Sequence, residues 1–206
     1  EHLQDDGLVV AEADEDLRLY ETGHIAGAVK IDWVADLNDP VKRDLVSGAD
    51  FTRLCSEKGI SPEDTIVFYG DNRNWWAAYA LWVFTLFGHR DLRLLDGGRQ
   101  KWVSEGRELT RDPTERPHTP YPPVERNDTQ ERAFRDQVEE HIRIGHPLID
   151  VRTPEEYRGD LLSLPGYPQE GAIRGGHIPG AWNIPWDVAV NDDGTFKPVE
   201  QLREIY

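Results

Sequence analysis

One eleven-residue stretch occurs twice in this chain of 206 residues. The first copy, at residues 23–33, reads Gly-His-Ile-Ala-Gly-Ala-Val-Lys-Ile-Asp-Trp, and the second, at residues 176–186, reads Gly-His-Ile-Pro-Gly-Ala-Trp-Asn-Ile-Pro-Trp. Seven of the eleven positions are identical at a constant separation of 153 residues. Solenoid repeats have periods of about 20–50 residues, so a separation this long indicates a duplicated domain.

Stretches typical of strands and of helices alternate around the first copy. In chain order they are an apolar run at 8–10, the repeat itself, a helix at 49–59, a β-rich run at 65–69, an apolar helix at 74–87, a strand at 92–95 and a short helix at 99–105. Alternating strands and helices with short links predict an α/β fold, in which a mostly parallel sheet carries helices on both faces.

The second copy contains only the first part of this series. Its predicted elements are a helix at 130–144, a strand at 147–152 and a helix at 199–206. Aligning the last helix with the helix at 49–59 places Tyr206 opposite Cys55, so the counterparts of the later elements are missing. We therefore predict a first domain at 1–112, an extended linker with five prolines at 113–129, and an incomplete second domain at 130–206. The sequence is interpreted as truncated at both ends.

Composition disfavours several classes of protein. The formal net charge of −16 is unfavourable for binding nucleic acid or an anionic membrane, because both need basic patches. No stretch approaches the roughly 20 apolar residues of a membrane-spanning helix. One cysteine excludes an internal disulfide framework, and the histidines lack metal-ligand spacing, so we expect neither a metal nor a cofactor. A cytoplasmic location is expected, with a targeting segment allowed for because the N-terminus reads as missing.

Two motifs resemble those of the rhodanese family. Asp-Val-Arg-Thr-Pro-Glu-Glu-Tyr at 150–157, followed by Gly-His-Ile-Pro-Gly-Ala at 176–181, is similar to the opening motif of rhodanese domains. Leu-Asp-Gly-Gly-Arg-Gln-Lys-Trp at 95–102 is similar to their closing motif. The doubled arrangement resembles the tandem-domain thiosulfate and 3-mercaptopyruvate sulfurtransferases. The resemblance implies two rhodanese-like domains, of which the second carries a catalytic cysteine and the first is a degenerate copy.

The resemblance also implies a chemistry and its partners. Sulfane sulfur would pass from a small anionic donor, thiosulfate or one such as 3-mercaptopyruvate, to cyanide or another thiophilic acceptor through a cysteine persulfide. The family's cysteine begins a loop after a strand, and its counterpart in the first copy is Gly70, which lies 15 residues after Cys55. In the second copy that position falls beyond Tyr206. We therefore expect this chain alone to be inactive until a segment or another chain completes the second domain.

Cys55, the single cysteine, is a poor candidate for the nucleophile. It lies late in the helix predicted at 49–59, and it shares one face of that helix with Phe51 and Leu54. The C-terminal end of a helix disfavours a thiolate, and apolar surroundings raise the pKa of a thiol. We expect Cys55 to be a small buried hydrophobic residue.

The repeated histidines and two arginines are the polar candidates. His24 and His177 lie in identical Gly-His-Ile turns, and a local hydrogen bond that fixes the turn is favoured over catalysis because the first copy has no nucleophile. Arg152 and Arg158 are candidate contacts for an anionic donor, with solvated surface arginines as the alternative. Glu156 stands where the resemblance implies a substrate-binding arginine, and this departure places the identity of the donor in question.

Four tryptophans are candidates for an apolar wall of the substrate site. Trp33 and Trp186 end the two repeated stretches, and Trp75 and Trp76 follow the Gly70 position. The resemblance implies that these positions face a cleft between the two domains, whereas the alternative is ordinary core packing. Apolar walls would exclude water from a persulfide.

Two alternative functions remain open on the same fold. A non-catalytic rhodanese-like module would bind a partner protein, and a phosphatase would need a longer cysteine loop. The residues that follow Tyr206 discriminate the three. A short loop that begins with cysteine indicates sulfur transfer, a longer loop from cysteine to arginine indicates phosphate chemistry, and no cysteine indicates a binding module.

Overall fold

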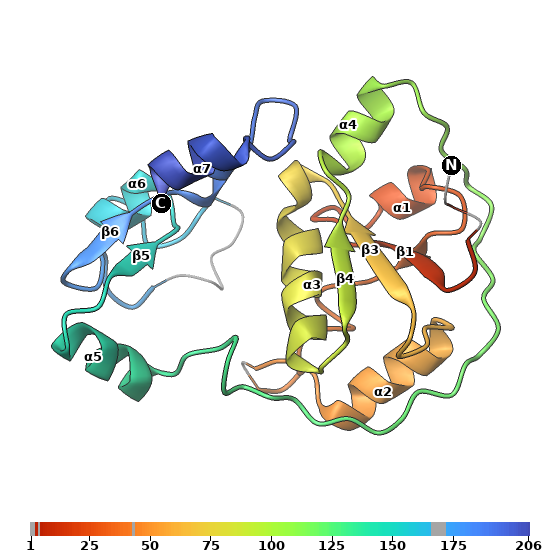
Figure 1. Cartoon of the computed structure of the whole chain (residues 1–206), viewed down its shortest axis with the longest axis horizontal. Coiled ribbons are helices and arrows are strands. Elements are labelled where there is room, and N and C mark those ends of the chain that lie inside the picture. Colours follow the sequence, from red (N-terminus) through yellow and green to blue (C-terminus); the bar gives the residue numbers. More distant parts are fainter. Residues whose placement is uncertain (1–2, 4, 43, 166–171) are drawn as a thin grey trace. The chain divides into compact units, whose positions relative to one another are not determined.

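The computed structural model describes residues 3, 5–42, 44–165 and 172–206. Contacts between residues divide the chain into two units (Figure 1). Unit 1 contains residues 1–132 and 192–195, and unit 2 contains residues 133–191 and 196–206. The predicted domain bounds stay a prediction, because this division does not test them.

Unit 1 contains a four-stranded sheet in which every pairing is parallel. The strand order is β2-β1-β3-β4. The elements are β1 (Leu8–Glu12), α1 (Leu19–Thr22), β2 (Val29–Lys30), α2 (Gly48–Glu57), β3 (Thr65–Tyr69), the 3-10 helix η1 (Asn72–Asn74), α3 (Trp75–Leu86), β4 (Asp91–Leu94) and α4 (Gly98–Ser104). The strands and helices α2, α3 and α4 lie within a few residues of their predicted positions, whereas α1 and η1 were not predicted. The parallel α/β fold predicted for the first copy is confirmed.

The period of two in the strands distributes apolar side chains to both faces of this sheet. Val9 and Ala11 of β1 pack with buried residues of α2 and α3 on one face. Val10 of β1 and Tyr69 of β3 pack on the other, where Tyr20 of α1 and Trp102 of α4 lie against them. Helices therefore cover both faces, and the carboxyl ends of β1 and β3 meet at one edge.

The proline-rich segment after α4 follows the surface of unit 1. The backbone N–H of Thr119 donates to the carbonyl of Ser56, and that of Asn127 donates to the carbonyl of Leu86. Tyr121 is buried, and its backbone N–H donates to the hydroxyl of Ser56. The segment has the extended form that its prolines predict, and it is tied to unit 1 along its length.

Unit 2 has a two-stranded parallel sheet of β5 (Leu148–Asp150) and β6 (Ala181–Asn183). Its helices are α5 (Arg135–Arg143), α6 (Pro154–Arg158), the 3-10 helix η3 (Trp186–Ala189) and α7 (Val199–Ile205). The helix predicted at 130–144 therefore begins later than expected. Arg132 instead forms an ion pair with Asp44 of unit 1 at 2.9 Å. Phe134 is the N-cap of the helix, and its backbone N–H donates to the side chain of Gln137.

Candidate active site

Gly70 follows β3 at the carboxyl edge of the unit 1 sheet, where ligands bind in open α/β folds. A Cβ atom added at Gly70 would lie 2.1 Å from the carbonyl oxygen of Ala13 and 3.5 Å from Oδ1 of Asp14. Such a contact with backbone is sterically excluded, so only glycine fits. Unit 1 therefore has no room for a cysteine at the position that corresponds to the family's nucleophile.

The loop that follows Gly70 has a strained backbone held by side chains. Asn72, Arg73 and Asn74 have φ angles of 42°, 56° and 66°, which residues with a Cβ rarely adopt. Asn74 Oδ1 accepts from the backbone N–H of Gly70 at 3.0 Å, and its Nδ2 donates to the carbonyl of Leu95 at 2.8 Å. Asp14 Oδ1 accepts from the backbone N–H of Asp71 at 2.8 Å. The backbone N–H groups of Gly70 and Asp71, which an anion would need as donors, are thus already hydrogen-bonded to side chains of the protein.

Carboxyl groups crowd this corner of unit 1. Glu12, fully buried, pairs with Arg99 at 2.6 Å and accepts from the hydroxyl of Tyr69. Burial and a hydrogen bond with Glu12 raise the pKa of Asp14 to about 9, and the charge of Asp71 adds to the effect. Asp14 is therefore a neutral acid at pH 7. Sequence analysis missed this cluster, because its partners come from strands and helices far apart in the chain.

The corresponding corner of unit 2 carries an arginine. The ladders pair Ala11 with Val29 in unit 1 and Ile149 with Trp182 in unit 2, at corresponding positions of the repeat. Arg152 of unit 2 is consequently the counterpart of Asp14. Its guanidinium donates to Asp150 at 2.6 Å and to the carbonyl of Gly176 at 2.9 Å. This ion pair lowers the pKa of Asp150.

The short helix α6 explains the glutamate that departs from the family pattern. Thr153 is its N-cap and accepts from the backbone N–H of Glu156, while the Glu156 carboxylate accepts from the backbone N–H of Thr153 at 3.2 Å. This reciprocal capping box stabilises the start of the helix. Arg158 ends α6 with ion pairs to Glu155 at 3.1 Å and Asp160 at 2.9 Å, and about half of its side chain is exposed.

Both repeated histidines make the local hydrogen bond that the sequence predicts. His24 Nδ1 lies 2.9 Å from the carbonyl of Tyr20, and His177 Nδ1 lies 2.8 Å from the carbonyl of Tyr157. Each imidazole stacks on its tyrosine, with ring centroids 3.8 and 3.6 Å apart. In both units the tyrosine hydroxyl donates to an alanine carbonyl in the turn. The histidines fix the turn, as expected.

Three of the four candidate tryptophans gather in unit 1. Trp33 and Trp76 stack with ring centroids 3.5 Å apart and planes 9° apart, and Trp75 lies 5.7 Å from Trp76. The indole N–H groups of Trp33 and Trp76 are buried and have no hydrogen-bond partner. Trp186 lies in η3 of unit 2, where its backbone N–H donates to the carbonyl of Val151.

Cys55 is buried in α2, as predicted from its helix face. Its side chain is fully inaccessible, and burial raises the pKa of the thiol far above its usual value. A thiol in this state is neither ionised at neutral pH nor reachable by a donor.

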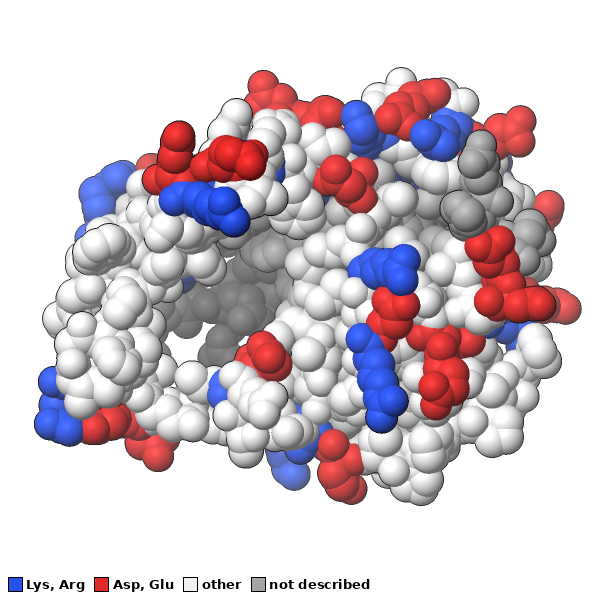
Figure 2. All heavy atoms as spheres, in the orientation of Figure 1, with Lys and Arg blue, Asp and Glu red and all other residues white. Residues whose placement is uncertain are grey.

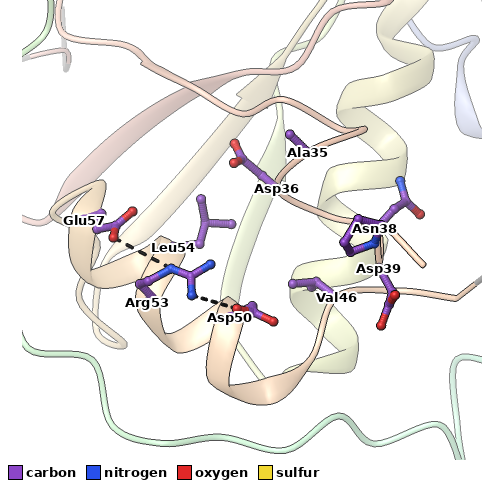
Figure 3. Close-up of a pocket in the computed structure, with 10 residues that line it drawn as sticks. Ala35, Asp36, Asn38, Asp39, Val46, Asp50, Arg53, Leu54 and Glu57 are labelled. Carbon is purple, nitrogen blue, oxygen red and sulfur yellow. Dashed lines mark ion pairs between the residues drawn. The ribbon is translucent and has the colours of Figure 1, made fainter. Parts of the chain in front are cut away.

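A hollow in unit 1 lies between α2 and the loop after β2 (Figure 3). Arg53 of α2 lines this hollow and forms ion pairs with Asp50 at 2.7 Å and Glu57 at 3.8 Å.

In the part of the chain that the structure describes, no group of three or more His, Cys, Asp and Glu side chains is placed to hold a metal ion. No helix among the described residues is long and apolar enough to cross a membrane. On the face shown in Figure 2, basic side chains are scattered among acidic ones.

Comparison with known proteins gives the family. A model of the rhodanese-like domain matches residues 1–105 and 134–205. The chain belongs to the rhodanese family. The predicted family and fold class are therefore confirmed, and the match in two segments agrees with the internal repeat of this rhodanese chain.

The relatives of this rhodanese chain include proteins that are more than half identical to it. A protein of Mycobacterium bovis named as the thiosulfate sulfurtransferase SseA is 55% identical over 205 residues, which cover 100% of this chain and 69% of the relative. The sulfur carrier protein TtuD of Thermus thermophilus is 56% identical over 214 residues, which cover 100% of this chain and 73% of that protein. Both relatives are longer than this chain. Their names agree with the predicted sulfurtransferase class.

Solved structures show the same fold. The crystal structure of SseA from Escherichia coli, a 3-mercaptopyruvate sulfotransferase, matches with a TM-score of 0.82 and 23% identity. The match covers 100% of this chain and 78% of that one. A cysteine-to-serine variant of EanB in complex with hercynine matches with a TM-score of 0.77 and 22% identity, over 96% of this chain and 50% of that one.

Proposed function

We propose that the protein to which this chain belongs is a sulfurtransferase that carries sulfane sulfur on a cysteine of its second domain. The observation that carries the proposal is the identity of 55–56% along the whole chain with a protein named as a thiosulfate sulfurtransferase and with a sulfur carrier protein. The donor is a small anionic sulfur compound, thiosulfate or one such as 3-mercaptopyruvate, and the acceptor is thiophilic.

The contacts of unit 1 support a proposed place for the nucleophile of the second domain. In unit 1, β3 pairs with β1 and brings Gly70 beside Ala13 and Asp14. The corresponding strand of the second domain would pair with β5 and bring its first loop residue beside Val151 and Arg152. We infer that the catalytic cysteine occupies this place and is supplied by residues after Tyr206. The isolated chain is then inactive.

The proposed reaction is a double displacement. The thiolate attacks the outer sulfur of thiosulfate, the sulfur–sulfur bond of the donor breaks, and sulfite leaves with the electron pair. The cysteine now carries a persulfide. An acceptor such as cyanide attacks the terminal sulfur, thiocyanate forms, and the thiolate is regenerated. Covalent catalysis of this kind divides one transfer into two easier steps.

Arg152, Arg158, Trp33, Trp75, Trp76 and Trp186 are proposed to serve the donor. Arginine suits a small dianion because its guanidinium offers several donors in a fixed plane. In a protein with a net charge of −16, a local cation in a dry site outweighs distant charges that solvent screens. The tryptophans would exclude water from the persulfide.

The cytoplasmic location of the protein also stays a prediction.

The test compares this chain with the same protein extended past Tyr206. We expect the extended protein to form thiocyanate from thiosulfate and cyanide, and the 206-residue chain to form none. Cys55→Ala in the extended protein should leave activity unchanged, because Cys55 is buried and its thiol is protonated. Loss of activity in that variant, with the fold retained, would contradict the assignment of the nucleophile.

The sequence of the extension separates the alternatives. An extended protein without a reactive thiol, and without thiocyanate formation, would support a non-catalytic binding module. Release of phosphate from an aryl phosphate, in place of thiocyanate formation, would support a phosphatase.

A further inference from the structure

Two arginines occupy the same place in the two units, although they come from different parts of the sequence. Arg99 of α4 in unit 1 donates to Glu12 at 2.6 Å and to the carbonyl of Gly23 at 2.5 Å. Arg152 in unit 2 donates to Asp150 at 2.6 Å and to the carbonyl of Gly176 at 2.9 Å. Glu12 corresponds to Asp150, since each accepts at its carbonyl from the isoleucine at the same position of the repeat. Both units therefore hold a guanidinium between this carboxylate and the turn.

The two units differ in what remains beside the nucleophile position. In unit 1 the arginine comes from α4, and residue 14 is a further carboxyl group only 3.5 Å from the Cβ position at Gly70. In unit 2 the arginine is itself residue 152, so a guanidinium takes the sequence position that the Asp14 carboxyl group has in unit 1. The corner of unit 1 holds the Glu12–Arg99 pair together with Asp14 and Asp71. Among the described residues of unit 2, the pair of Asp150 and Arg152 lies there, with Glu156 acting on Arg152.

We propose that Arg152 is a positioning residue that sets the charge beside the nucleophile of the second domain by compensating Asp150. The proposal rests on the proposed function, because it requires a nucleophile at the place that corresponds to Gly70. This role is additional to the contact with the sulfur donor proposed for Arg152, because it acts through Nε and Nη2, which donate to Asp150 and to the carbonyl of Gly176.

The consequence for the nucleophile follows from electrostatics. A carboxylate near a thiol disfavours the thiolate and raises the pKa of the thiol, while a nearby cation lowers it. With the ion pair intact, the charges of Asp150 and Arg152 offset each other. The hydrogen bond from Arg152 to the carbonyl of Gly176 also holds the turn at residues 176–178 in place. Removing either partner leaves one uncompensated charge, and the sign of that charge depends on which partner is removed. Among the described residues, Glu156 of α6 interacts electrostatically with Arg152, and His177 of the turn interacts electrostatically with Asp150.

The experiment uses the protein extended past Tyr206, with Cys55→Ala so that this thiol does not contribute. The rate of alkylation by iodoacetamide is measured against pH, which gives the apparent pKa of the catalytic thiol. Arg152→Gln should raise that pKa by about one unit, and Asp150→Asn should lower it by a similar amount. The double variant should return close to the unaltered value. Arg152→Lys, which keeps the charge, should do so too.

The opposite signs distinguish this role from a purely structural one. A structural role predicts that both single variants are less stable and that neither shifts the thiol pKa with the expected sign. Glu140→Gln and Arg143→Gln provide a matched control, because this exposed pair on α5 has the same 2.6 Å separation. If Arg152→Gln does not fold, the shift in Asp150→Asn alone decides.

The outcomes separate this proposal from the proposed function. A reactive thiol whose pKa is unmoved, or moves in the same direction in both single variants, overturns the role of Arg152 and leaves sulfur transfer standing. An unaltered extended protein without a reactive thiol overturns both.

Discussion

Asp14, beside the Gly70 position, makes this corner of the first domain unfavourable for binding an anion. Burial, Glu12 and Asp71 raise its pKa to about 9, against roughly 3.9 in an unfolded chain. Between these values the folded protein keeps a proton that the unfolded chain releases. The free energy of unfolding should therefore fall as the pH rises from about 4 to 9.

Asp14→Asn should remove this fall in the free energy of unfolding at high pH. An asparagine can accept from the backbone N–H of Asp71 through Oδ1 and donate to Glu12 through Nδ2, so it reproduces the neutral acid without its ionisation. We expect urea denaturation to show a variant more stable than the unaltered chain by roughly 1 kcal/mol or more at pH 8, with a weaker dependence on pH. Asp16→Asn is the control, because Asp16 is exposed and Arg18 holds its pKa at about 2. Equal pH dependence in the Asp14→Asn variant and the unaltered chain would refute the protonated state.

Residues were predictable from sequence where a local pattern specified them. The burial of Cys55 followed from the apolar face of its helix, and the hydrogen bonds of His24 and His177 followed from their identical turns. The cluster around Glu12 was not predictable in this way. Its partners Tyr69 and Arg99 are 57 and 87 residues away in the chain, and only the register of the sheet brings them together.

Among the elements, the loop after β3 carries the difference between the two copies. In unit 1 its first residue is held against β1, with the carbonyl of Ala13 at the place where a Cβ would lie. We predict that Gly70→Cys does not give the first domain sulfurtransferase activity, although it places a thiol at the family's position. The variant should be destabilised by about 1–3 kcal/mol, because the backbone of β1 must move.

The measurement for Gly70→Cys is thiocyanate formation together with the midpoint of urea denaturation. Gly106→Cys is a suitable comparison, since nothing lies within 4 Å of a Cβ at this exposed turn and its cost is limited to the positive φ of 69°. A Gly70→Cys variant that is as stable as the unaltered chain and active would show that the loop opens more easily than its contacts indicate.

Apart from α1 and η1, the elements of unit 1 were predicted to within a few residues because strand and helix patterns alternate there. The helix predicted at 130–144 was less accurate. Its first residues have helical composition, but Arg132 pairs with Asp44 and with Asp128 at 3.6 Å, and tertiary contacts of this kind override local propensity. The contacts of the proline-rich segment were also beyond sequence analysis, because Tyr121 reaches Ser56 across 65 residues.

At the scale of the whole molecule, corresponding positions of the two units differ sharply in burial. In unit 1, β1 lies between β2 and β3, whereas in unit 2, β5 pairs with β6 alone among the described residues. Ile149 of β5 is 39% exposed and its counterpart Ala11 is fully buried. Ile178 is 47% exposed and its counterpart Ile25 is 1% exposed. The same pattern of sequence is thus packed in one unit and uncovered in the other.

This contrast predicts unequal stability within one chain. Local opening costs little where few apolar contacts form, so amides of β5 and β6 should exchange with solvent deuterium at least ten times faster than those of β1 and β3. In the protein extended past Tyr206, a strand paired with β5 should slow exchange there, while β1 serves as an internal control that does not change. A dye that reports apolar surface should bind the 206-residue chain more strongly than the extended protein. Exchange from β5 as slow as from β1 in the 206-residue chain would show that unit 2 needs no further strand.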